Sequence, residues 1–101
     1  MPDFKRALAM SQLPPGGSRV VEIDGKAVAL FNVEGRFYAL ENACPHRGGP
    51  LGEGDLSGQE VTCPWHAWTF DVPTGCGTHT AAQAKIYQVK IEGEDVWVAA
   101  G

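Results

Sequence analysis

The chain has 101 residues, which is enough for one small domain and too short for two, so we expect a single domain over residues 1–101. Its formal net charge of −4 argues against nucleic acid and anionic membranes as partners, because both require a basic surface. A protein partner with a basic or mixed-charge surface fits better. No apolar stretch approaches the roughly 20 residues of a membrane helix, and residues 1–6 lack the pattern of a signal peptide. We therefore expect a cytoplasmic protein.

Short runs of β-forming residues alternate with turn signals along the chain, and no stretch has a convincing helical period. In chain order, the predicted strands are residues 4–9, 19–24, 26–33, 36–41, 59–63, 67–72, 85–92 and 95–99. Tight turns at Asp24-Gly25, Glu34-Gly35 and Gly93-Glu94 join neighbouring strands into hairpins. Three segments are predicted to be irregular, namely residues 11–18, 42–58 and 73–84. This pattern predicts an all-β domain.

Two proline-containing loops each carry one cysteine and one histidine. These residues are Cys44 and His46 in residues 43–52, and Cys63 and His66 in residues 62–68. Two thiolates and two imidazoles suit either a tetrahedral zinc ion or an iron–sulfur cluster. A common zinc finger groups its cysteines and carries its histidines on a helix, whereas here each loop mixes both and lies between strands. Mixed loops are what a two-iron cluster with differently ligated irons requires.

The order and spacing of these ligands resemble the Rieske motif, in which Cys-x-His is followed, after sixteen positions, by Cys-x2-His. Flanking residues resemble it too: Arg47, Gly48, Gly49, Leu51, Gly54, Phe70, Asp71, Thr74 and Gly75. The resemblance covers roughly residues 18–99. It implies stacked antiparallel sheets that hold one [2Fe–2S] cluster at one tip, between the two loops. It also implies that Cys44 and Cys63 bind the buried iron, and that His46 and His66 bind the outer iron near solvent.

Two features of the high-potential Rieske proteins of respiratory cytochrome bc-type complexes are missing from this chain. The first is a disulfide between the loops, whose positions correspond to Gly49 (or a neighbour) and Trp65, so no such clamp can form. The second is a pair of Ser and Tyr hydroxyl donors, where this chain has Trp68 and Phe70. Without these donors the reduced state is less stabilised, and we expect a potential toward the lower end of the Rieske range, about −150 mV.

The resemblance implies an electron carrier, and no catalytic residue is predicted. The favoured role is a soluble, low-potential ferredoxin that passes electrons from a flavin reductase to a ring-hydroxylating oxygenase. The main alternative is the small Rieske subunit of an assimilatory NADH-dependent nitrite reductase. An iron–sulfur domain of another oxygenase system and a zinc-binding module also stay open. We expect a monomer when the protein is free.

A few residues outside the ligand set admit two interpretations. Trp65, between two ligands, could shield the cluster from water or contact a docked partner, and the two roles are compatible. Cys76 is expected to be a structural thiol, and His79 an inert surface side chain. Pro50 is expected to shape the first loop, and Trp97 to belong to the core or a sheet face.

Overall fold

Antiparallel strands make up most of this computed structural model, which describes residues 4–43, 49–65, 68–78 and 82–99. The strands are β1 (Lys5–Ala9), β2 (Ser18–Ile23), β3 (Lys26–Val33), β4 (Arg36–Glu41), β5 (Asp55–Ser57), β6 (Glu60–Thr62), β7 (Thr69–Asp71), β8 (Ile86–Glu92) and β9 (Asp95–Ala99). Two 3₁₀ turns, η1 (Met10–Gln12) and η2 (Leu51–Glu53), are the helical elements within those ranges. The prediction of an all-β fold is confirmed. No helix of the described residues has the length and apolar character needed to cross a membrane.

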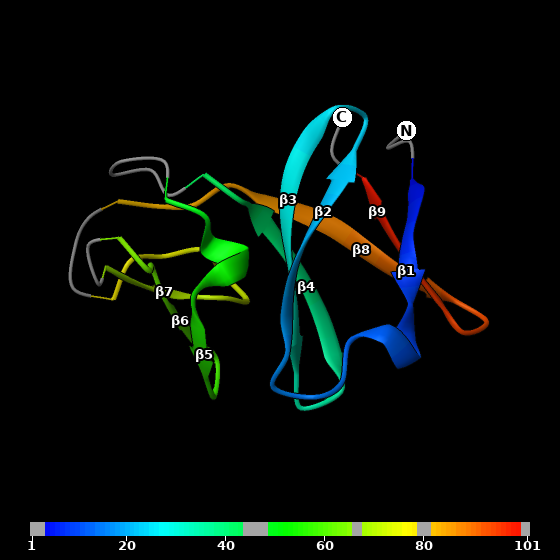
Figure 1. Cartoon of the computed structure of the whole chain (residues 1–101), viewed down its shortest axis with the longest axis horizontal. Helices are drawn as coiled ribbons and strands as arrows, with labels where there is room; N and C mark the ends of the chain where they lie inside the picture. The colour runs from blue at the N-terminus through cyan, green and yellow to red at the C-terminus, as the bar shows by residue number, and fades with distance from the viewer. Residues whose placement is uncertain (1–3, 44–48, 66–67, 79–81, 100–101) are drawn as a thin grey trace.

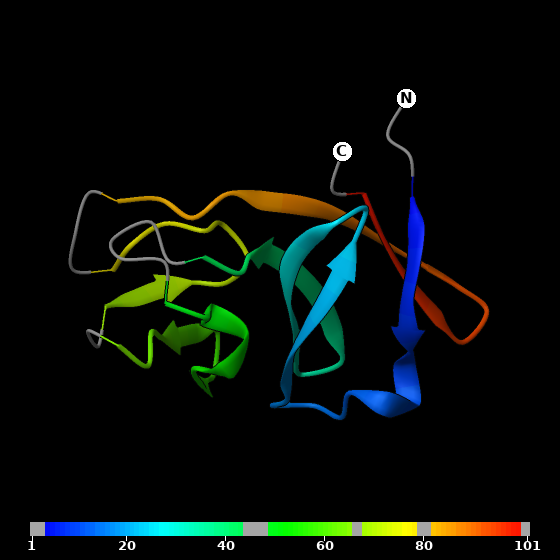
Figure 2. The ribbon, with the colours of Figure 1, turned by 45° about the horizontal axis from the view of Figure 1, so that its top comes forward.

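The strands form two antiparallel sheets. The larger has the order β1-β9-β8-β4-β3-β2, and the smaller has the order β5-β6-β7. Figures 1 and 2 show the small sheet at one end of the molecule, beside the ends of β4 and β8. The two predicted ligand loops belong to that end, because both adjoin the small sheet or the segment that leads into it.

Two tight turns produce the β2–β3–β4 meander. In each turn both central residues have positive φ: 52° at Asp24 and 77° at Gly25, then 53° at Glu34 and 95° at Gly35. This is the pattern of type I′ turns, whose twist matches that of a hairpin, and both hairpins are as predicted.

Buried apolar side chains form two separate cores. The terminal core consists of Leu8, Leu13, Ile23, Val28, Leu30, Phe37, Ala39, Val96 and Val98. The loop-side core consists of Ala29, Phe31, Val33, Leu40, Leu51, Val61, Cys63, Phe70, Val72 and Ala84. Strand β3 contributes to both, with Val28 and Leu30 on one face and Ala29 and Phe31 on the other, as its alternation predicts.

The segment predicted as irregular over residues 42–58 is more ordered than expected. It contains η2 and β5, which pairs with β6 so that Leu56 lies opposite Val61. Likewise η1 overlaps the predicted irregular segment 11–18, and β6 and β7 are shorter than their predicted ranges. In residues 42–58, pairing of β5 with the neighbouring β6 and the packing of Leu51 and Leu56 in or against the loop-side core outweigh a local composition rich in glycine.

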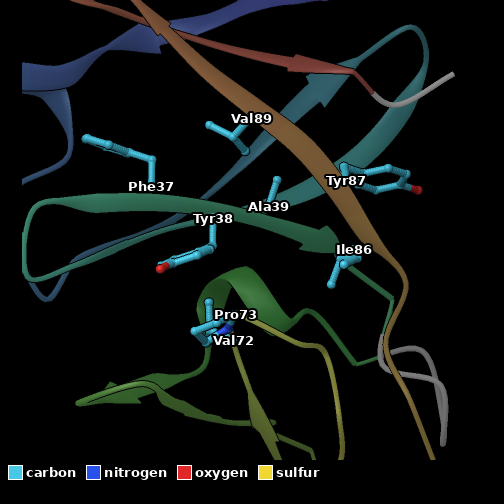
Figure 3. Close-up of a pocket in the computed structure, with 8 residues that line it drawn as sticks. All are labelled: Phe37, Tyr38, Ala39, Val72, Pro73, Ile86, Tyr87 and Val89. Carbon is cyan, nitrogen blue, oxygen red and sulfur yellow. The ribbon is translucent and has the colours of Figure 1, made fainter. Parts of the chain in front are cut away.

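A shallow apolar pocket marks the junction between the two sheets. Val72 and Pro73, just after β7, face Tyr38 of β4 and Ile86 of β8 across it (Figure 3). Tyr87 also lines this pocket, and the pKa of its phenol is raised by burial and by the nearby carboxylate of Glu41. The two sheets are joined by the loop-side core, in which Phe31 and Leu40 of the large sheet lie in one cluster with Val61 and Phe70 of the small sheet.

Candidate iron–sulfur centre

The first ligand loop is fixed at its base by hydrogen bonds to Asn42. The backbone oxygen of Asn42 accepts the N–H of Leu51 at 2.8 Å, and the side-chain Oδ1 of Asn42 accepts the N–H of Gly52 at 2.8 Å. Its own N–H donates to the carbonyl of Ala27 at 3.1 Å. A β-bridge between Ala43 and Pro50 closes the base of the loop, which agrees with the role expected of Pro50.

The second ligand loop is the turn of the β6–β7 hairpin. Thr62 and Thr69 form the last register pair, and the N–H of Cys63 then donates to the carbonyl of Trp68 at 2.7 Å. Four residues, 64–67, lie between the two partners of this bond. A short, closed loop of this kind limits the positions that a ligand within it can adopt.

Cys63 is the one predicted ligand that lies among the described residues. Its side chain belongs to the loop-side core and is 2% exposed. The other predicted ligands, Cys44, His46 and His66, lie outside the described residues, as do Arg47 and His79. The burial of Cys63 agrees with its expected role on the inner iron.

Gly49 of the first loop lies directly against Cys63 of the second. A Cβ atom at residue 49 would be 2.8 Å from Sγ of Cys63 and 3.1 Å from Cγ of Trp65. Glycine at this position therefore lets the backbone of the first loop lie directly against a buried thiol, where a larger residue would clash. The two loops together contain this buried cysteine, one more cysteine and two histidines. This set of residues fits the donor set of a Rieske cluster.

Side chains just after the second loop offer no free hydroxyl within residues 68–70. Phe70 is fully buried in the loop-side core, and Trp68 packs against that core. The single hydroxyl, on Thr69, is hydrogen bonded to that of Thr78. This agrees with the expected loss of hydroxyl donors. Cys76 is a free cysteine and is exposed, and its expected role as a structural thiol stays a prediction.

Sequence reasoning missed Asn42, the residue that anchors the first loop. An Asn immediately before an irregular segment is a known turn signal, because its side chain bonds backbone groups further along the chain, and this could have identified it.

We expect Asn42→Ala to lower the free energy of unfolding by about 1–3 kcal/mol, because the buried Gly52 N–H loses its partner. Asn42→Asp keeps an acceptor oxygen at the same place and is the matched control. Urea denaturation of both variants measures the difference. Equal stability of the alanine variant and the parent protein would contradict the anchoring role.

Comparisons with known proteins show which family the chain belongs to. The model of the Rieske [2Fe-2S] domain matches residues 3–98. The ferredoxin component of the naphthalene 1,2-dioxygenase system of Pseudomonas aeruginosa is 41% identical over 95 residues, covering 91% of this chain and 90% of the relative. The chain therefore belongs to the Rieske [2Fe–2S] domain family, and the resemblance predicted from the motif is confirmed.

Two solved structures extend the comparison. A chain from the complex of reduced oxygenase and oxidized ferredoxin in carbazole 1,9a-dioxygenase is 31% identical, with a TM-score of 0.88, covering 95% of this chain and 92% of that one. The putative NADH-dependent nitrite reductase small subunit from Mycobacterium tuberculosis has a TM-score of 0.91 at 24% identity, covering 100% of this chain and 97% of that chain. At that identity, the second likeness shows the fold alone.

Proposed function

We propose that the chain is a Rieske ferredoxin, with one [2Fe–2S] cluster held by Cys44, His46, Cys63 and His66 in a single domain over residues 1–101. The observation that carries this proposal is the buried thiol of Cys63, with Gly49 of the other loop against its sulfur. The family match over residues 3–98 supports the cofactor class. When bound, such a cluster takes up and releases one electron.

The role that we favour is electron transfer from a flavin reductase to a ring-hydroxylating oxygenase. The 41% identical relative is a ferredoxin component of a naphthalene 1,2-dioxygenase system, and the two chains match over nearly their whole lengths. The complex from carbazole 1,9a-dioxygenase, in which oxygenase and ferredoxin occur together, supports an oxygenase as one partner. The alternative, a nitrite reductase small subunit, rests on a likeness of fold alone. We also propose that the protein works in the cytoplasm, as a monomer when free.

Charge around the ligand loops favours a basic partner surface. Residues 42–84 contain four acidic residues and one basic residue, Arg47, so this segment has a formal charge of −3. Three of the acids lie on one face of the small sheet, because Ser57 pairs with Glu60 and Glu60 with Asp71, while Asp55 pairs with Thr62. Such a surface speeds encounter with a positively charged partner.

Reconstitution tests this function. The purified red protein is supplied as the only ferredoxin between a flavin reductase and a ring-hydroxylating oxygenase, and hydroxylated product is measured. Product that depends on the chain supports the proposal. A chain that instead restores activity to a sirohaem nitrite reductase lacking its small subunit, and transfers no electrons to the oxygenase, would support the alternative. A colourless chain loaded with zinc would overturn both.

The midpoint potential is a second, independent expectation. The lack of a free hydroxyl in residues 68–70 leaves the reduced state without those donors, so we expect a value near the lower end of the Rieske range, about −150 mV. A redox titration followed by EPR of the reduced state measures it. A midpoint above about +100 mV would contradict the assignment to the low-potential class.

A further inference from the structure

The two ligand loops touch through Trp65 and Gly49. Trp65 is 59% exposed, yet a Cβ at Gly49 would lie 3.1 Å from its Cγ and 3.2 Å from its Cδ2. One part of the indole thus lies against the first loop while the rest faces solvent. Since the same hypothetical Cβ would be 2.8 Å from Sγ of Cys63, the indole and the thiol meet at one glycine.

Close approach, not backbone conformation, is the reason for glycine at position 49. Gly58 and Gly93 have positive φ, and a Cβ on either would meet nothing within 4 Å. Gly49 shows the reverse. It is buried, and it is not among the described residues with positive φ. The place that its Cβ would occupy is filled by the side chains of Cys63 and Trp65 from the other loop. A glycine of this kind marks a place where another group must approach the backbone.

We propose that Trp65 packed on Gly49 is a noncovalent clamp, which holds the second ligand loop on the first and keeps water from the sulfur of Cys63. This inference rests on the proposed function, because it concerns retention of the cluster. Residues 49 and 65 cannot form a disulfide, as expected from the sequence. They still connect the two loops, because the side chain of Trp65 contacts Gly49.

The clamp acts on the cluster in two ways. Packing against Gly49 restrains the loop that carries Cys63 and His66, so its loss speeds release of iron. Exclusion of water from a ligating sulfur disfavours the more negative, reduced state, so loss of the indole raises the midpoint potential. The fold itself depends little on Trp65, because the side chain is more than half exposed.

The test uses the holoprotein, four single variants and the double variant Trp65→Ala/Gly49→Ala. Trp65→Ala removes the indole, Trp65→Phe keeps part of it, and Gly49→Ala forces the two loops apart. Ile91→Ala is the matched control, since Ile91 is another exposed large apolar residue, 43% exposed, on β8. The readouts are the half-life of visible absorption under a chelator, the midpoint potential, and the thermal melt.

We expect Trp65→Ala to shorten the half-life about tenfold and to raise the midpoint, with Trp65→Phe in between and Ile91→Ala unchanged. Gly49→Ala should shorten the half-life as well. The half-life of the double variant should be shortened by less than the product of the two single-variant factors, because both substitutions act on one contact. Should Trp65→Ala not fold, the Phe variant and Gly49→Ala decide by the same readouts.

An unchanged half-life and midpoint in the Trp65 variants would overturn the clamp. Failure of the proposed function would look different, because the parent protein itself would then bind no iron–sulfur cluster.

Discussion

Replacing Cys63 with serine is expected to abolish the visible absorption of the purified protein. Cys63 is 2% exposed, within the loop-side core and beside Gly49 of the other loop. A serine hydroxyl is a poor ligand for a cluster that thiolates and imidazoles hold, and the buried site offers no route for an external thiol to replace it. Iron and labile sulfide analysis should fall from two of each per chain to near zero.

Cys76→Ser is the matched control for this prediction. Cys76 is also a free cysteine, but it is exposed and is not one of the four predicted ligands. We expect this variant to keep the full spectrum and the iron content of the parent protein. His46→Ala should behave like Cys63→Ser if the motif assigns the ligands correctly. A Cys63→Ser protein with unchanged iron, or a Cys76→Ser protein without iron, would refute the proposed ligand set.

Phe70→Ala is expected to cause the largest loss of stability. The Phe70 side chain is fully buried in the loop-side core, and its strand leads directly out of the second ligand loop. Truncating a buried phenylalanine to alanine costs about 3–5 kcal/mol, from lost apolar burial and the cavity left behind. A small domain is stable by only about 5–15 kcal/mol, so urea denaturation should show a large shift.

Leu30→Ala is the control that separates a general loss of folding stability from an effect on the iron–sulfur site. Leu30 is equally buried, but it belongs to the terminal core and not to the core that contains Cys63. Its truncation should cost about 2–5 kcal/mol. Under conditions where both variants are folded, only Phe70→Ala should change the visible circular dichroism and speed the loss of iron. Identical spectra and identical iron loss in the two variants would show that the loop-side core does not support the site.

The strands that local sequence specifies could be predicted almost to the residue. Asp24-Gly25 and Glu34-Gly35 adopt the positive φ values that a type I′ turn requires, so the turn residues alone define β2, β3 and β4. The motif likewise predicted the family, because the spacing of Cys and His is specific, and Cys63 is buried as its expected role requires.

The rest was hidden in segments whose glycines and prolines predict irregular structure. Strand β5 is joined to β6 by the two-residue turn Gly58-Gln59, and this local hairpin lies at the end of a segment that its many glycines made us predict as irregular. Asn42 is important because Gly52 folds back onto its side chain. The approach of Trp65 to Gly49 also joins two loops, and only their positions in space reveal it.

The position of strand β3 between the two cores has a consequence for unfolding. Its alternate side chains form part of the wall of each core, Leu30 on one side and Phe31 on the other. If one core unfolds, β3 is lost and the other core loses part of its packing, so the two cores should unfold as one cooperative unit. The chain then has no half-melted form in which one sheet is lost while Cys63 stays enclosed.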